Sequence, residues 1–128
     1  VLGGGLYLSL YFFSAYAASA TEWLASFMAL PLSIDMMAPA IGASGAISGV
    51  IGAYALLFPN NKPKAWGPIP AAYARPFHLT LAWVGLNLAL GFVGPGIGVA
   101  IAIWSHIGGF IAGLLLARPM LLWRYRSA

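Results

Sequence analysis

Long stretches of this chain carry no charged side chain, and this feature constrains the fold more than any other. No Lys, Arg, Asp or Glu occurs at positions 1–21, 36–61 or 76–117. Charged residues are only 6% of the 128 residues, whereas about a quarter is typical of a soluble domain. Such a chain lacks the charged surface of a soluble or a disordered protein. It is therefore expected to be an all-α integral membrane protein whose helices face lipid.

Four membrane-spanning helices fit into these stretches, because about 20 apolar residues cross a bilayer core. The last stretch is too long for one helix and is divided at Gly94-Pro95-Gly96. The predicted helices cover residues 3–20, 43–58, 77–93 and 98–117. Residues 1–128 are expected to form a single membrane domain. Since the chain starts just before a helix, it is expected to be an N-terminally truncated fragment.

The basic residues predict the orientation in the membrane. All of them follow either the second or the fourth predicted helix, so four spans put them on one side: Lys62, Lys64, Arg75, Arg118, Arg124 and Arg126. The two acidic residues, Glu22 and Asp35, fall on the other side. The positive-inside rule then makes the 59–76 loop and the C-terminus cytoplasmic. The net charge of +4 is interpreted as this orientation signal, and no nucleic-acid partner is expected.

Small residues recur every four positions in the second and fourth predicted helices, which predicts that these two helices pack together. They are Ser44, Ser48 and Gly52 beside Gly45, Gly49 and Ala53 in one helix, and Ser105, Gly109, Gly113 and Ala117 in the other. Packing alone is sufficient to explain such stripes. His106, however, precedes Gly109 by three residues, and at about 100° per residue it faces nearly the same seam.

Ser44 and His106 are therefore candidates for a nucleophile and its general base. An ionisable residue inside a membrane is costly and suggests a function, and a neutral His bonded to a Ser lowers that cost. The second predicted helix, roughly 24 Å long, is short for a core of about 30 Å. Residues 36–41 are then expected to be irregular backbone facing a water-filled cavity, with Ser44 at its floor. Free N–H groups at that helix start could stabilise an oxyanion.

Two motifs resemble those of the rhomboid intramembrane proteases. One is G-x-S-G followed by small residues, Gly42-Ala43-Ser44-Gly45-Ala46-Ile47-Ser48-Gly49. The other is H-x-x-G-x-x-x-G, His106-Ile107-Gly108-Gly109-Phe110-Ile111-Ala112-Gly113. The two motifs follow the family's order on separate spans, and the resemblance covers the whole chain. It implies a rhomboid-like helical bundle with a six-helix core, of which this chain holds the last four helices.

By this resemblance, Ser44 is the nucleophile and His106 the general base of a dyad without an acid partner. The supporting residues for the oxyanion hole and the helix packing are Gly42, Gly45, Gly109 and Gly113. The implied activity is a serine endopeptidase that cleaves membrane proteins in or near their transmembrane segments. The resemblance implies no cofactor and no metal, and it predicts no oligomeric state. The expected location is a bacterial inner membrane, and an organelle membrane is the alternative.

Departures from the family pattern leave a second function open. The H-x-x-x-N motif, which helps to hold the oxyanion in the family, occurs nowhere in the chain. Ser48 stands where several members have an aromatic residue packed on the His, and Ser105 where Ala is common. The alternative is a rhomboid-like protein without protease activity that binds or chaperones membrane helices. A transporter or channel is disfavoured, because no Asp, Glu, Lys or Arg lies inside a predicted span.

Other side chains that carry chemistry have simpler interpretations. We expect His78 at the membrane interface and Asp35 to be a solvated loop charge rather than a triad acid. Asn87 is expected to bond a neighbouring helix, and Trp104 to pack against lipid or a neighbouring part of the chain rather than to hold a ligand. Two His and two acidic residues, far apart in the sequence, do not make a metal-ligand set.

Overall fold

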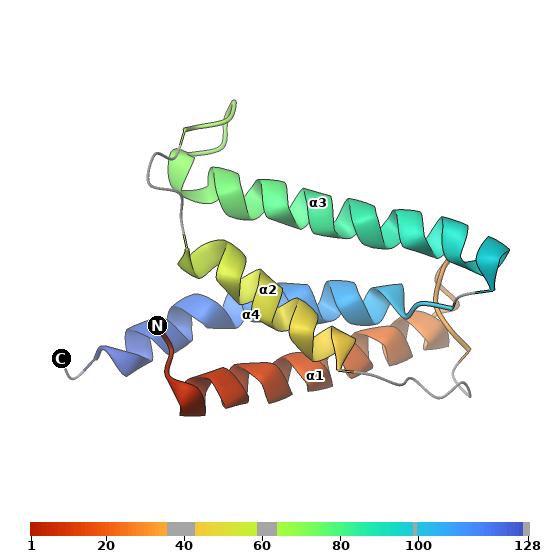
Figure 1. Ribbon diagram of the computed structural model, residues 1–128, viewed down its shortest axis with the longest axis horizontal. Coiled ribbons are helices and arrows are strands. Elements are labelled where there is room, and N and C mark those ends of the chain that lie inside the picture. The colour runs from red at the N-terminus through yellow and green to blue at the C-terminus, as the bar shows by residue number, and fades with distance from the viewer. Residues whose placement is uncertain (36–42, 59–63, 99, 127–128) are drawn as a thin grey trace.

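The computed structural model describes residues 1–35, 43–58, 64–98 and 100–126, which fold into four α-helices and one short 3-10 helix (Figure 1). The elements are α1 (Gly4–Phe27), α2 (Ser44–Leu57), α3 (Ala71–Val93), η1 (Gly94–Ile97) and α4 (Ile103–Arg124). Trp66 and Ile69 form an isolated bridge, and the described residues contain no strand. The predicted all-helical fold with four helices is confirmed.

Successive helices run in opposite directions, so their connections alternate between two ends of the bundle (Figure 1). The start of α3 and the end of α4 lie at the same end, and these two segments carry Arg75 and Arg124. Glu22 lies near the end of α1, toward the opposite end of the bundle. This distribution agrees with the separation of basic and acidic residues predicted from four spans.

The packing of α2 against α4 depends on glycine. A Cβ atom added to Gly109 would fall on the carbonyl oxygen of Gly45, and one added to Gly113 would fall on that of Gly49. Backbone atoms of the two helices therefore occupy the space that side chains would need. The prediction that these helices pack through their small-residue stripes is confirmed.

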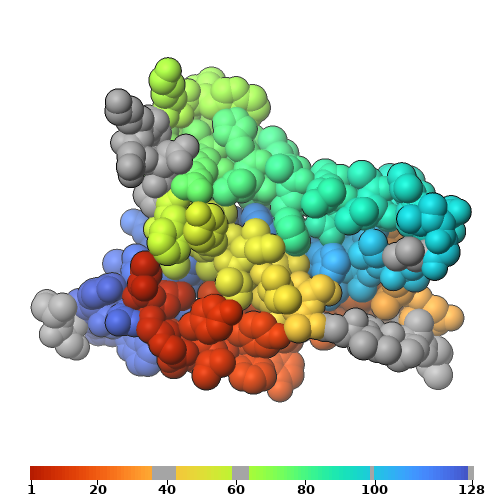
Figure 2. Space-filling model, in the orientation of Figure 1, coloured from red at the N-terminus to blue at the C-terminus, as the bar shows by residue number. Residues whose placement is uncertain are grey.

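The third member of this tightly packed group is α1. Its buried residues recur every three or four positions: Leu10, Ser14, Ala18, Glu22 and Ala25. An added Cβ at Gly49 would meet Ser14, and one at Gly108 would meet Thr21. Phe110 on α4 is fully buried, and a Cβ added to Gly52 of α2 would fall on its carbonyl oxygen. On the face shown in Figure 2, α2 lies between α1 and α3.

By contrast, α3 buries only a few residues, which are Ala74, Pro76, Asn87 and Gly91. It contacts α4 through Trp83, which stacks on Phe110 with ring centroids 5.9 Å apart. Much of its remaining surface consists of exposed apolar side chains, as expected for a helix that faces lipid. The segments Ala71–Ile97 and Ile103–Arg124 are each long and apolar enough to cross a membrane, and Ser44–Leu57 is a shorter apolar helix.

The helix α1 ends later than predicted. Its predicted range stops at residue 20, before the first charge, but the helix continues to Phe27. The reason is that Glu22 is buried among backbone donors and does not face the membrane. For α2 the predicted and observed ends agree within one residue.

The ends of α3 and α4 also differ from prediction. Pro76 was expected to precede α3, but α3 begins at Ala71 and contains Pro76. Because proline has no backbone N–H group, the helix lacks one intrahelical hydrogen bond at this position. Gly98 has φ of 76° and ends η1, so α4 begins at Ile103 rather than at 98. At its other end, α4 passes residue 117 and continues to Arg124, because exposed basic side chains do not interrupt a helix that leaves the membrane.

Candidate functional site

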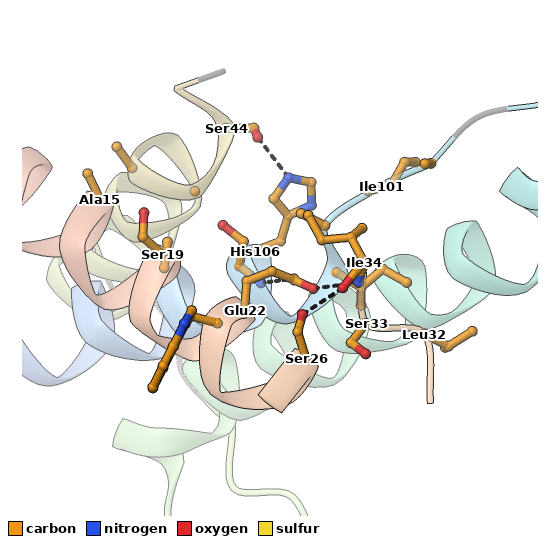
Figure 3. Close-up of a pocket in the computed structure, with 18 of the residues that line it drawn as sticks. Ala15, Ser19, Glu22, Ser26, Leu32, Ser33, Ile34, Ser44, Ile101 and His106 are labelled. Atoms are coloured by element: carbon orange, nitrogen blue, oxygen red, sulfur yellow. Dashed lines mark hydrogen bonds between the residues drawn. The ribbon is translucent and has the colours of Figure 1, made fainter. Parts of the chain in front are cut away.

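Ser44 and His106 lie 62 positions apart in the chain, yet their side chains are within hydrogen-bond distance. The Oγ atom of Ser44 is 2.9 Å from Nε2 of His106, and Figure 3 shows the imidazole pointing toward the serine. Ser44 is the first residue of α2 and is exposed, whereas His106 is the fourth residue of α4 and is half-buried. The close approach of the two helices through Gly45 and Gly109 brings the pair together.

The pair opens into a cavity of about 850 Å³ bounded by α1, the start of α2 and the start of α4. The lining includes small and polar residues, among them Ala15, Ala18, Ser19, Ala43, Gly45, Ala46 and Ser105. A cavity of this size is within the range of ligand-binding clefts. The sequence placed Ser44 beside such a cavity, but the predicted irregular segment 36–41 and Gly42 lie outside the described residues.

The second nitrogen of the imidazole faces α3. Nδ1 of His106 is 2.7 Å from Oδ1 of Asn87, and Nδ2 of Asn87 donates to the carbonyl oxygen of Trp83 at 2.8 Å. Asn87 is only 1% exposed. The prediction that this asparagine bonds a neighbouring helix is confirmed. The identity of its partner was missed, although a lone Asn in an apolar span was a signal that it needed one.

Glu22 holds the start of α4 from a different helix. Its carboxylate oxygens accept the N–H groups of Ser105 and Ile34, each at 2.9 Å, and the side chain is buried (Figure 3). The N-cap residue of α4, Ala102, offers no side-chain bond. Glu22 therefore supplies the oxygen that an N-cap side chain usually provides to the third helical residue. The sequence placed Glu22 outside the predicted helices; the structure corrects this, because two backbone donors compensate its burial.

Three other residues that the sequence analysis singled out do not take part in the Ser44–His106 hydrogen bond. The ring of His78 lies 4.5 Å from that of Trp66. The indole N–H of Trp104 donates to the carbonyl oxygen of Pro31 at 2.9 Å, so this Trp packs against a neighbouring segment, as predicted. Asp35 is exposed at the cavity margin, and the bond of Nδ1 goes to an amide rather than to this acid.

Ser48 stands where several rhomboid sequences have an aromatic residue. Its side chain is buried and forms its hydrogen bond within α2. Its hydroxyl donates to the carbonyl oxygen of Ser44 at 2.8 Å. Gly109 and Gly113 are also buried, in the seam with α2. Three of the four supporting glycines, Gly45, Gly109 and Gly113, thus lie in this seam, where Gly109 packs against Gly45 and Gly113 packs against Gly49.

Comparisons with known proteins agree with the motifs. The family model of the Rhomboid domain matches residues 1–123. The chain is 31% identical over 117 residues to "Rhomboid protein 1, mitochondrial" of Saccharomyces cerevisiae, a match that covers 90% of this chain. The chain spans 31% of the length of that yeast protein. No solved structure matches the chain.

Proposed function

Because this chain belongs to the rhomboid family, we propose that it carries the catalytic dyad of an intramembrane serine endopeptidase. Ser44 is the nucleophile and His106 the general base. The observation that supports this assignment best is the 2.9 Å contact between Oγ and Nε2 at the edge of a cavity. The family and the apolar helices make the chain an integral membrane protein. From the family we infer that the substrates are membrane proteins as well. Cleavage occurs in or near their transmembrane segments.

The proposed reaction has two steps, each with proton transfer through His106. In the first, Oγ of Ser44 attacks the carbonyl carbon of the scissile bond while Nε2 takes the hydroxyl proton. The C–N bond then breaks, and the imidazolium gives this proton to the leaving amine. In the second step, His106 deprotonates a water molecule that attacks the ester carbon, and the proton returns to Ser44 as the acid is released. This chemistry requires neither a metal nor a cofactor.

The start of α2 is suited to the oxyanion that forms in both steps. The first N–H groups of an α-helix have no partner in the helix and lie at the positive end of its dipole. Among the described residues, the first backbone hydrogen bond of α2 is donated by the amide of Ile47 to the carbonyl of Ala43, at 2.9 Å. The amides of Ser44 and Gly45 precede this bond, beside the nucleophile. These N–H groups support the proposed oxyanion role of this segment.

We expect a fluorophosphonate probe to label the intact protein at Ser44. An activated serine attacks the phosphorus atom and expels fluoride, whereas an ordinary serine hydroxyl reacts far more slowly. Labelling in detergent, followed by mass spectrometry of peptides, locates the adduct. In the His106→Ala variant, the labelling rate should fall by about 10²-fold or more, because the general base is lost.

The same experiment discriminates between the two candidate functions. A wild-type protein that stays unlabelled, beside a soluble serine hydrolase that is labelled in the same tube, would contradict the endopeptidase. It would favour a rhomboid-like protein that binds or chaperones membrane helices without cleaving them. The observation that keeps this second function under test is Ser48, which stands where several family members have an aromatic residue packed on the His.

We also propose a bacterial inner membrane as the location, with the 59–76 connection and the C-terminus in the cytoplasm. The common end of Arg75 and Arg124 supports this orientation. The chain has no cysteine, so single cysteines can report on it. In intact spheroplasts, an impermeant maleimide should react with Asp35→Cys, and with Lys64→Cys only after permeabilisation. The reverse pattern would refute the orientation.

A further inference from the structure

We propose that Asn87 is a positioning residue, whose side-chain carbonyl holds His106 in the tautomer that can accept the proton of Ser44. This inference rests on the proposed endopeptidase and extends it to a third helix. The three side chains come from three elements, Ser44 from α2, Asn87 from α3 and His106 from α4. The hydrogen bonds between them form one continuous chain that begins at the backbone of α3.

The orientation of the Asn87 amide is fixed by its own backbone partner. A carbonyl oxygen can only accept a hydrogen bond, so the atom 2.8 Å from the carbonyl of Trp83 must be the amide nitrogen. The amide oxygen then faces Nδ1 of His106, at 2.7 Å. Flipping the amide would place two oxygens against each other at the Trp83 contact. Oδ1 is therefore the acceptor offered to the imidazole.

This acceptor determines which imidazole nitrogen carries the proton. With the proton on Nδ1, the imidazole donates to Asn87, and Nε2 is left with a lone pair facing Oγ of Ser44. With the proton on Nε2, the lone pair of Nδ1 would face Oδ1 at 2.7 Å, which is repulsive. Only the first arrangement lets His106 accept the hydroxyl proton. Asn87 thus selects the reactive tautomer.

The environment strengthens this selection. Asn87 is 1% exposed, so a water molecule does not readily replace its oxygen. When Nε2 takes the proton, the imidazolium still donates from Nδ1, and the amide dipole stabilises the new charge. A neutral amide provides this at less cost than an ionised carboxylate in an apolar span. The amide thus performs the orienting function that an acid performs in a three-residue catalytic site, without a buried negative charge on α3.

Two substitutions separate positioning of the imidazole from simple packing. Asn87→Leu keeps a similar volume but removes the acceptor, whereas Asn87→Asp keeps an oxygen facing Nδ1, and as the neutral acid its second oxygen still donates to the carbonyl of Trp83. Leu86→Ala is the matched control, because Leu86 is the neighbouring residue on α3 and is 53% exposed. We expect Asn87→Leu to lower kcat by about 10²-fold with KM within about twofold of wild type. Asn87→Asp should recover at least a tenth of the wild-type kcat, and Leu86→Ala should match wild type.

A spectroscopic measurement tests the tautomer without substrate. In the intact protein with ¹⁵N-labelled histidine, the nitrogen shifts of His106 show which ring nitrogen carries the proton, and a His106→Gln sample assigns them. We expect the proton on Nδ1 in wild type and in Asn87→Asp, and its loss from Nδ1 in Asn87→Leu. If Asn87→Leu does not fold, the wild-type spectrum still decides, because a proton on Nε2 would overturn the proposal.

The outcomes separate this inference from the proposed function. If Ser44 is required for cleavage but Asn87→Leu retains the wild-type kcat, the role of Asn87 is wrong and the endopeptidase stands. If Ser44 is not required, the endopeptidase fails and the catalytic role of Asn87 fails with it, whatever the spectrum shows. An equal loss of kcat in Leu86→Ala would also overturn the proposal, because it would show that any change in α3 has the same effect.

Discussion

Replacing Ser44 by alanine in the intact protein is expected to lower cleavage of a membrane-protein substrate by at least about 10⁴-fold. The substitution removes Oγ, the atom that forms the acyl bond. In the part of the chain that the structure describes, no other serine is hydrogen-bonded to Nε2 of His106. Ser44 is exposed at the first position of α2, so its loss should leave the fold intact. Cleavage is measured as product appearing over time in liposomes that contain enzyme and substrate.

The matched control for this prediction is Ser9→Ala. Ser9 lies on α1 and does not line the cavity, and its hydroxyl donates to the carbonyl of Gly5 at 3.0 Å within the same helix. Its removal should leave cleavage at the wild-type rate. Ser44→Ala should still bind the substrate, which can be measured by co-purification, because binding does not use the reacting atom. Undiminished cleavage by Ser44→Ala would refute the proposed dyad.

The pairing that creates the candidate site could be predicted because it depends on small residues at a fixed spacing. Gly45 and Gly49 on one helix, with Gly109 and Gly113 on the other, allow a backbone contact that larger residues would prevent. Once these two stripes face each other, the positions of Ser44 and His106 follow from helical geometry. The sequence therefore carried enough information to bring these two residues together.

The contribution of α3 could not be predicted in the same way. Apolar residues surround Asn87 on both sides in the sequence, and α3 has no small-residue stripe as long as those of α2 and α4 to indicate its partner. The partner of Asn87 depends on the tilt and depth of α3, which are set by a few tertiary contacts such as Trp83 with Phe110. The need for a partner could be predicted, but its identity could not.

The end of α1 shows a different limit. The sequence argument ended the helix where the first charge appears, because a charge usually leaves the membrane. That rule fails at Glu22, since its carboxylate is bonded to two backbone N–H groups inside the protein. One of these groups belongs to Ser105, next to His106 in the chain. A residue that seemed to mark a loop thus holds the helix that carries the proposed general base.

Replacing Glu22 by leucine is accordingly expected to destabilise the fold by about 2–6 kcal/mol, because two backbone N–H groups lose their acceptor at a cost of about 1–3 kcal/mol each. The amides of Ser105 and Ile34 would lose their acceptor, and the start of α4 would lose its cap. Equilibrium unfolding in mixed micelles with increasing SDS measures the change. Leu24→Ala, at a position 50% exposed on the same helix, should stay within about 0.5 kcal/mol of wild type.

Glu22→Gln distinguishes the cap from the volume of the side chain. Glutamine has nearly the same size, but it retains only one oxygen acceptor, so one of the two amides must lose its bond. We expect it to lose roughly half of the free energy lost by Glu22→Leu, because each unpaired N–H costs about 1–3 kcal/mol. Cleavage should fall with stability in both variants, since a displaced Ser105 moves His106 away from Ser44. A Glu22→Leu protein as stable as wild type would show that α4 holds its start without this carboxylate.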